Sequence, residues 1–368
     1  MIKLTIPMNT RFLLILLLLT LGSICFSQEL LWQIGVHNLF DNSEFAPSTT
    51  RASRTMSGTQ IRSIIGIGIE GKHQILAGAN LNHEWGDSQL VSDAKLIAHY
   101  KYHIPNFEFN IGAFPKKTLL GRYPRNMFSD SIYWTQPIMN GFFAEYQRDK
   151  NHANFWLDWT GAKKAVTYES FYIGWSGQLQ KNILYIRHFG YMFHQVMFDN
   201  IAIIDNTPSI SVKDNVKTIT ALGIDLDGHT ALNRLESNIG VSVSMERDRK
   251  TDETHTPIGL IWETDAEFRG IGLKNTLYYG NSQQRFYDRY SNHLYWGDLM
   301  YKTQMYDRVD LIVHFYKSNI LNIKLELSLH FAERHIYNQQ ILTASFDLDN
   351  FRNKNLDKSY KYIWDSWF

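Results

Sequence analysis

The sequence predicts a transmembrane antiparallel up-and-down β-barrel of about 16 strands, within a range of about 14 to 18. Apolar and polar residues alternate with a period of two through most of the chain, as they do in strands with two different faces. Short turns alternate with long loops. Beyond the N-terminal segment no run of about 18 apolar residues predicts a membrane helix, yet aromatic residues make up 14% of the chain.

The N-terminal segment reads as an export signal. Lys3 and Arg11 precede an apolar run, residues 12–21, which only a threonine interrupts. Small residues then end at Ser27, which predicts cleavage after that residue and makes residues 1–27 a signal peptide. We therefore expect an exported protein that resides in the cell outer membrane.

The composition of the remaining chain excludes several classes of protein. The only cysteine, Cys25, leaves with the signal, so disulfides cannot stabilise the mature fold. The signal also removes two of the 37 basic residues, which leaves 35 against 36 acidic residues, a net charge of −1. This balance gives no support for nucleic-acid binding. No metal-ligand spacing or glycine-rich phosphate loop is found, so we expect no cofactor and no metal.

The strands follow from the alternation and from the turn residues between them. The clearest strand is 321–331, in which leucine, isoleucine and phenylalanine occupy every odd position and polar residues every even one. The predicted strands are 30–39, 58–70, 73–85, 94–104, 107–115, 141–148, 152–160, 168–180, 183–195, 216–226, 234–246, 256–263, 266–280, 307–317, 320–332 and 338–349.

The connections predict how the barrel lies in the membrane. Those after strands 2, 4, 6, 8, 12 and 14 are short, whereas most connections after odd-numbered strands are long. Short turns in the periplasm and long loops outside are typical of outer-membrane barrels. The long loops are 40–57, 86–93, 116–140, 196–215 and 281–306. We expect a single barrel domain, 28–368, in which 351–368 form either the last strand or a periplasmic tail.

Charge fixes which face of each strand meets lipid. A lysine that faces lipid near the midplane of the bilayer costs about 2–4 kcal/mol. The alternate strand positions that carry the charged residues, here called the charged parity, should therefore face a water-filled lumen. That parity holds Glu108, Asp158, Asp310, Lys324 and Glu326. The opposite parity predicts two aromatic girdles, an upper one with Trp85, Trp159, Tyr279 and Phe331 and a lower one with Phe107, Tyr185 and Trp262. We place His188 and His194 in the lumen as neutral histidines.

The C-terminal residues carry a resemblance. Tyr360, Tyr362, Trp364 and the terminal Phe368 share one parity, although Ser366 departs from it. This looks like the aromatic-terminated last strand that barrel-assembly machinery recognises. With the Ser27–Gln28 junction and the overall layout, the chain resembles porin-like outer-membrane barrel proteins of Bacteroidota-type Gram-negative bacteria. The resemblance implies membrane lipid and small hydrophilic solutes as partners, and it allows a homotrimer.

A barrel of this size is wide enough for an aqueous channel, so the first expected function is passive diffusion of small hydrophilic solutes. General porins narrow their pore with the third long loop. Here that loop, 116–140, carries a basic set that predicts an anion-favouring constriction if the loop folds inward. The set is Lys116, Lys117, Arg122 and Arg125, with Asp130 as the single acid. The alternative is a surface loop over the barrel mouth.

Two other functions remain open. The first is a surface carbohydrate-binding or structural barrel, because loop 281–306 mixes aromatic residues with arginines, as sugar-binding sites do. Contact with the membrane interface or packing within the loop explains such residues more often. The candidate residues of this loop are Arg285, Tyr287, Arg289, Tyr290, Tyr295, Trp296 and Asp298. The remaining class is an outer-membrane enzyme such as a lipase. The 14 histidines show no diagnostic pattern, and Ser328 with His330 only share a lumenal face, so we expect no enzymatic activity.

Overall fold

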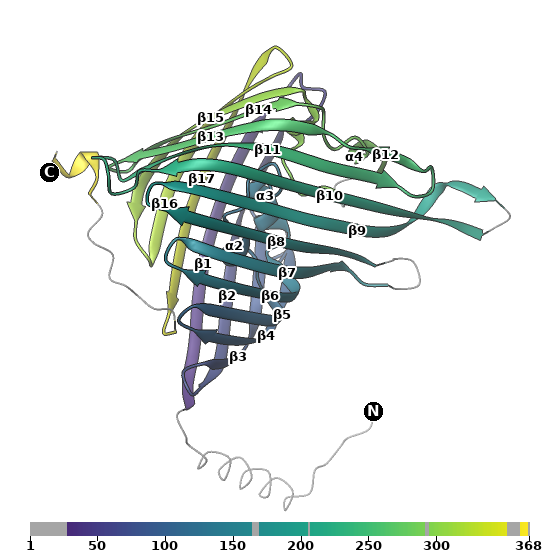
Figure 1. The fold of residues 1–368 in the computed structure, drawn as a ribbon. Helices are drawn as coiled ribbons and strands as arrows, with labels where there is room; N and C mark the ends of the chain where they lie inside the picture. The colour runs from purple at the N-terminus through teal and green to yellow at the C-terminus, as the bar shows by residue number, and fades with distance from the viewer. Residues whose placement is uncertain (1–27, 164–168, 205–206, 291–293, 352–360, 367–368) are drawn as a thin grey trace, which may run out of the picture.

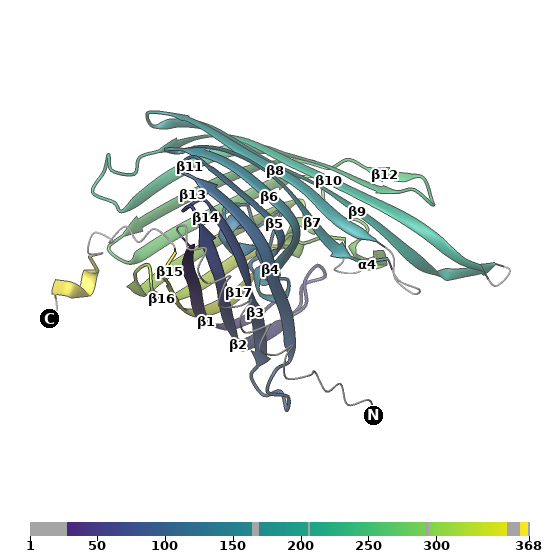
Figure 2. The same cartoon turned by 90° about the horizontal axis from the view of Figure 1, so that it is seen from below.

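The computed structural model describes residues 28–163, 169–204, 207–290, 294–351 and 361–366. The predicted signal peptide, 1–27, lies outside these residues. One antiparallel sheet closes on itself, because the last strand of the sheet pairs with the first. Figures 1 and 2 show the resulting barrel from two directions at right angles. Among the described residues, no helix combines the length and the apolar character needed to cross a bilayer.

The sheet has seventeen strand segments. The short β12 and the following β13 both pair with β11 and together occupy one strand position. The barrel therefore has sixteen strands. The segments are β1 (Gln28–Glu44), β2 (Arg54–Ile69), β3 (His73–Glu84), β4 (Asp93–Ile104), β5 (Phe107–Pro115), β6 (Ile138–Arg148), β7 (Asn151–Gly161), β8 (Ser170–Lys181), β9 (Leu184–Ile204), β10 (Thr207–Asp225), β11 (Arg234–Asp248), β12 (Glu253–His255), β13 (Ile258–Phe268), β14 (Ile271–Gly280), β15 (Met305–Lys317), β16 (Leu321–Ala332) and β17 (His335–Asp349).

The predicted fold class is confirmed, with a strand at each predicted position. Two connections differ. The predicted loop 196–215 is mostly strand, because β9 and β10 continue as a long hairpin that projects at the right of Figure 1. The turn before β14 lies at Arg269 and Gly270, whose φ angles of 47° and 89° suit a two-residue hairpin turn.

The wall carries its charged side chains inside and its aliphatic rows outside, as the cost of charge in lipid predicted. On β16 the side chains of Glu326 and Ser328 are each only 2% exposed, whereas Leu327 and Leu329 are 39% and 46% exposed. A soluble sheet would bury the leucines and expose the glutamate. The exposed aliphatic rows are therefore the surface that acyl chains cover.

Strand β9 corrects three expectations. Tyr185, predicted for the lower girdle, is 4% exposed and donates its hydroxyl to lumenal Glu236 over 2.7 Å. Its parity on β9 faces the lumen, because that face is aromatic as well. His188 and His194 have the opposite parity and lie on the outer, lipid-facing side, so they are not lumenal histidines.

The described residues of the C-terminal tail, 361–366, form no strand. The last strand, β17, ends at Asp349, and η3 (Ile363–Ser366) is not part of the sheet, although its Ile363 N–H donates to the Arg269 carbonyl in the turn before β14. Tyr362 stacks on Trp364 with ring centres 5.2 Å apart, and its hydroxyl accepts a hydrogen bond from the backbone N–H of Lys317. Tyr360 and Phe368 lie outside the described residues. Tyr362 and Trp364 therefore do not belong to the last strand, and the role of the aromatic residues in barrel assembly stays a prediction.

Candidate functional site

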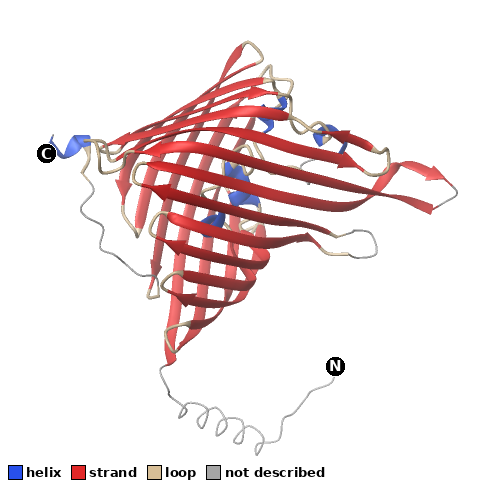
Figure 3. Ribbon diagram, in the orientation of Figure 1, coloured by secondary structure: helices blue, strands red, loops and turns tan. Residues whose placement is uncertain are grey.

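Two of the long loops fold inward from the outer ends of the strands, and Figure 3 shows the two helices of the first in blue within the ring of strands. The first, here called L3, is residues 116–137 and carries α2 (Lys117–Leu120) and α3 (Asp130–Thr135). The second, L7, is residues 281–304 and carries α4 (Tyr287–Tyr290) and η2 (Leu299–Lys302). Backbone hydrogen bonds join them, from Ser129 N–H to the Trp296 carbonyl and from Asp298 N–H to the Arg125 carbonyl.

The two loops share an aromatic core with the barrel wall. Phe128 of L3 is 2% exposed, and its ring centre lies 5.9 Å from that of Trp156 and 5.7 Å from that of Tyr191. Trp296 of L7 stacks on Tyr172 at 3.8 Å. Burying each such ring contributes about 1.5–3 kcal/mol. The middle of the lumen is therefore packed with side chains.

Ion pairs fasten L3 to the opposite wall. The Arg125 guanidinium contacts Asp310 at 2.6 Å and Glu326 at 2.5 Å, and it also pairs with Asp130 of its own loop. Burial alone would lower the pKa of Arg125, but these three carboxylates outweigh it and raise that pKa. Arg308 pairs with both wall carboxylates as well. The result is a buried network of alternating charge.

The predicted constriction residues all belong to L3, inside the barrel, and most of the basic ones form an ion pair with a carboxylate. Lys116 lies 2.7 Å from Asp158 and 4.0 Å from the centre of the Trp296 ring. Burial lowers the pKa of the Lys116 ammonium, while Asp158 offsets part of that effect. Arg122 pairs with Glu145, and Lys117 begins α2. L3 is thus held by its charges rather than presenting a ring of unpaired bases.

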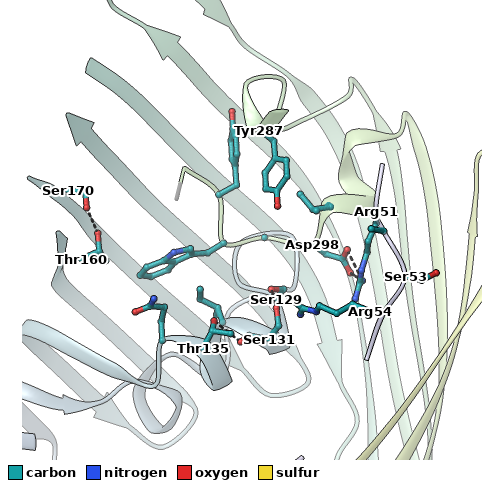
Figure 4. Close-up of a pocket in the computed structure, with 17 residues that line it drawn as sticks. Arg51, Ser53, Arg54, Ser129, Ser131, Thr135, Thr160, Ser170, Tyr287 and Asp298 are labelled. Carbon is teal, nitrogen blue, oxygen red and sulfur yellow. Dashed lines mark hydrogen bonds and ion pairs between the residues drawn. The ribbon is translucent and has the colours of Figure 1, made fainter. Parts of the chain in front are cut away.

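A pocket of about 480 Å³ opens where L3 and L7 meet the outer ends of the strands (Figure 4). Its walls come from four parts of the chain that are far apart in sequence. They are Arg51, Ala52, Ser53 and Arg54 before and at the start of β2; Ser129, Ser131, Ile132, Thr135 and Gln136 of L3; Thr160 and Ser170 at the rim of β7 and β8; and Tyr287, Tyr295, Trp296, Gly297, Asp298 and Leu299 of L7.

The pocket is rich in hydroxyl groups and carries a positive charge. Arg51 pairs with Asp298 at 3.2 Å and lies 4.2 Å above the Phe45 ring, so its guanidinium is held in place. Burial alone would raise the pKa of Asp298, but Arg51, His330 and Arg308 lower it, and the carboxylate stays ionised. Within the described residues no carboxylate pairs with Arg54. Its charge is available to an anionic ligand.

The pocket collects some of the residues that the sequence singled out in L7. Tyr287, Tyr295, Trp296 and Asp298 line it. Arg285 is exposed and binds Glu246 only through its backbone N–H. The side chains of Arg289 and Tyr290 lie outside the described part. The sequence thus predicted four of the six L7 residues that line the pocket.

The sequence analysis missed Arg51 and Arg54. The only signal was the run of serine, threonine and arginine at residues 48–54 in the first long loop. Alternation carries no information in a loop, and only closure of the barrel brings this segment against L7.

The described lining of the pocket offers groups that bind polar ligands. Guanidinium groups and hydroxyls hold phosphates and sugars. None of the described lining residues is a histidine, the usual base of a nucleophilic hydrolase. Among the described residues, no group of three or more histidine, cysteine and acidic side chains could hold a metal ion.

Comparison with known proteins gives one family and a fold. The sequence model of the family described as lipid A 3′-O-deacylase-type matches residues 24–354. No curated protein sequence matches. Among solved structures, a loop L8 deletion mutant of OmpT, an outer membrane protein of Vibrio cholerae, is similar over 88% of this chain and 100% of its own, with 8% identity and a TM-score of 0.52. OpdL of Pseudomonas aeruginosa covers 87% of this chain and 99% of its own, with 8% identity and a TM-score of 0.47.

The likeness to the OmpT mutant shows the outer-membrane barrel fold alone. The family match overturns two expectations from the sequence, namely the passive diffusion channel and the absence of enzymatic activity. The alternation and the number of strands predict only the barrel wall. A wall of this width is compatible with an enzyme as well as with a pore, because the loops inside the barrel decide between them.

Proposed function

Because the chain belongs to the lipid A 3′-O-deacylase-type family, we propose that it is an outer-membrane hydrolase that removes an ester-linked acyl chain from lipid A. In this reaction water adds to the acyl carbon and the bond to the sugar oxygen breaks. The products are a fatty acid and a lipid A with a free hydroxyl at that position. The observation that carries the proposal is the family match over 24–354.

The location of the barrel supports this function. Lipid A occupies the outer leaflet of the outer membrane, and the exposed aliphatic and aromatic rows of this barrel contact that leaflet. The substrate therefore reaches the protein by lateral diffusion and needs no pore. The filled lumen agrees with this, since Phe128 and Trp296 close the space that a diffusion channel would keep open.

The pocket at the mouth supplies a place for the polar part of the substrate. Lipid A is a phosphorylated glucosamine disaccharide, and the pocket offers Arg54, Arg51 held in place by Asp298, and several hydroxyls. Arginine binds phosphate through two parallel hydrogen bonds, which also fix its orientation. We assign the pocket to recognition of the sugar phosphate rather than to bond cleavage.

Mass spectrometry of lipid A tests the proposal. The full chain is expressed in a Gram-negative host whose lipid A keeps its 3′-linked acyl chain, and lipid A is compared with that of the same host carrying an empty vector. We expect a species lighter by one 3′-linked acyl chain, together with the matching free fatty acid when purified barrel is mixed with lipid A in detergent. Unaltered lipid A in both assays, with the barrel folded, would remove the proposal.

A variant separates recognition from cleavage. Arg54→Gln should raise KM severalfold with little change in kcat, because it removes a contact that substrate and transition state share. Arg148→Gln, at the short-turn end of β6, is the matched control and should leave both constants unchanged. A fall in kcat alone for Arg54→Gln would contradict the assignment of the pocket.

A further inference from the structure

A histidine and an aspartate are paired on the outer wall of the barrel. The Nδ1 atom of His194 on β9 lies 2.9 Å from Oδ1 of Asp214 on β10, and the two residues are register partners. The other carboxylate oxygen of Asp214 accepts a hydrogen bond of 2.5 Å from Nε of Arg249. Asp214 is only 8% exposed. The pair is therefore fixed and largely covered.

The pair faces lipid rather than the lumen. The flanking residues Phe193 and Lys213 are each 1% exposed inside the barrel, so the alternating positions point outward. The imidazole stacks on Phe171 with ring centres 5.2 Å apart, and Phe171 stacks on Trp159, which is 43% exposed.

No other histidine–carboxylate pair of the described residues has this position. The remaining pairs lie on the lumenal parity of their strands, and they are His37–Asp347, His103–Glu108 and His314–Glu267.

The height of the pair matches that of a lipid ester. His194 lies ten residues beyond Leu184, the first residue of β9 at the short-turn end. Ten residues span about 33 Å along a strand, which a tilt of about 40° reduces to about 25 Å of height. The apolar band of such barrels is about 25 Å tall. The imidazole therefore lies at its outer edge, where the acyl chains of a lipid join the polar head.

We infer that His194 is the general base of the deacylation and that Asp214 is the residue that positions it; this inference rests on the proposed function. With Nδ1–H donated to Asp214, the Nε2 lone pair is free to take a proton from a water molecule as that water attacks the acyl carbon. The imidazolium then returns the proton to the departing sugar oxygen. Water and ester become fatty acid and alcohol, and the base is regenerated.

Two arginines beside the pair suit an anionic substrate. Arg249 holds Asp214 and is 53% exposed along its side chain, and Arg247, the register partner of Asp214 on β11, is 45% exposed. Their guanidinium groups can contact the developing oxyanion or a head-group phosphate from the water side of the interface. The aromatic neighbours Trp159 and Phe171 offer an apolar surface to the acyl chain.

Steady-state kinetics on the purified full-length barrel, with lipid A in detergent micelles, tests the inference. His194→Gln should lower kcat by about 10²–10⁴-fold, the usual contribution of a general base. Asp214→Asn should lower kcat by a similar factor with KM nearly unchanged, since it misorients the imidazole and removes no substrate contact. The heat-dependent shift in gel mobility of each variant shows whether the barrel has folded.

The matched control is His188→Gln. His188 lies on the same lipid-facing side of β9, but its ring bonds Thr220 and Trp175 rather than a carboxylate. This variant should keep full activity. Wild-type activity in folded His194→Gln, or an equal loss in His188→Gln, would overturn the role of the pair and leave the deacylase function standing. An inactive wild-type protein would instead overturn the function, and this role with it.

Discussion

At the scale of single residues, charge inside the barrel is arranged by pairing. Wall carboxylates such as Asp310 and Glu326 are 0% and 2% exposed, and they meet arginines from L3 and from the wall itself. A buried carboxylate without a partner is expensive, so each arginine supplied by L3 also holds that loop in place. Pairing thus explains why a loop with four basic residues stays inside.

Arg125→Ala should destabilise the barrel by about 3 kcal/mol. This is the lower end of the range for breaking a buried pair, because Arg308 still contacts both carboxylates. Unfolding by guanidinium in lipid vesicles, followed by tryptophan fluorescence, measures the change. Arg122→Ala is the control, since Arg122 is 44% exposed beside Glu145 and should cost about 1 kcal/mol or less. Equal effects of the two substitutions would show that L3 is not fastened through Arg125.

At the scale of elements, the two inner loops decide what the barrel can do. A sixteen-stranded wall leaves a channel unless something fills it. L3 and L7 fill it jointly, since Phe128 lies 5.8 Å from Trp296 across their contact. The same two loops form most of the mouth pocket. The packing of L3 against L7 therefore both fills the lumen and forms the pocket at the mouth.

Removing these loops should open a pore. A Gly-Ser linker in place of residues 117–135, and a second one in place of 283–302, should give a large steady conductance in planar bilayers, whereas the unaltered protein should show little. Replacing 86–91, in a connection that lines neither the pocket nor the aromatic core, is the control and should stay closed. A conductance typical of open porins in the unaltered protein would contradict a filled lumen.

At the scale of the whole molecule, the fold was predictable and the sites were not. Alternation at 321–331 and turn residues such as Asn182, with a φ of 55°, are local signals, and they placed the strands. Tyr185 was assigned to the wrong face because β9 is apolar on both sides. The partners of Arg51 and His194 depend on which strands become neighbours when the barrel closes. Which residues become neighbours when the barrel closes depends on pairing between distant parts of the chain, and local sequence patterns do not predict it.

The inverted distribution of polarity gives a test of the whole barrel. Leu327 lies six residues beyond the start of β16, or about 15 Å above the short turns at a tilt of about 40°, near the middle of an apolar band about 25 Å tall. Leu327→Arg should therefore lower the free energy of unfolding in vesicles by about 2–4 kcal/mol. Ile336→Arg, equally lipid-facing but beside the outer turn at Glu333 and Arg334, should cost about 1 kcal/mol or less. If the two substitutions cost the same, or if Leu327→Arg is neutral, the aliphatic rows do not face acyl chains. His194 would then not lie beside the lipid ester either, because its height is reckoned from the same apolar band.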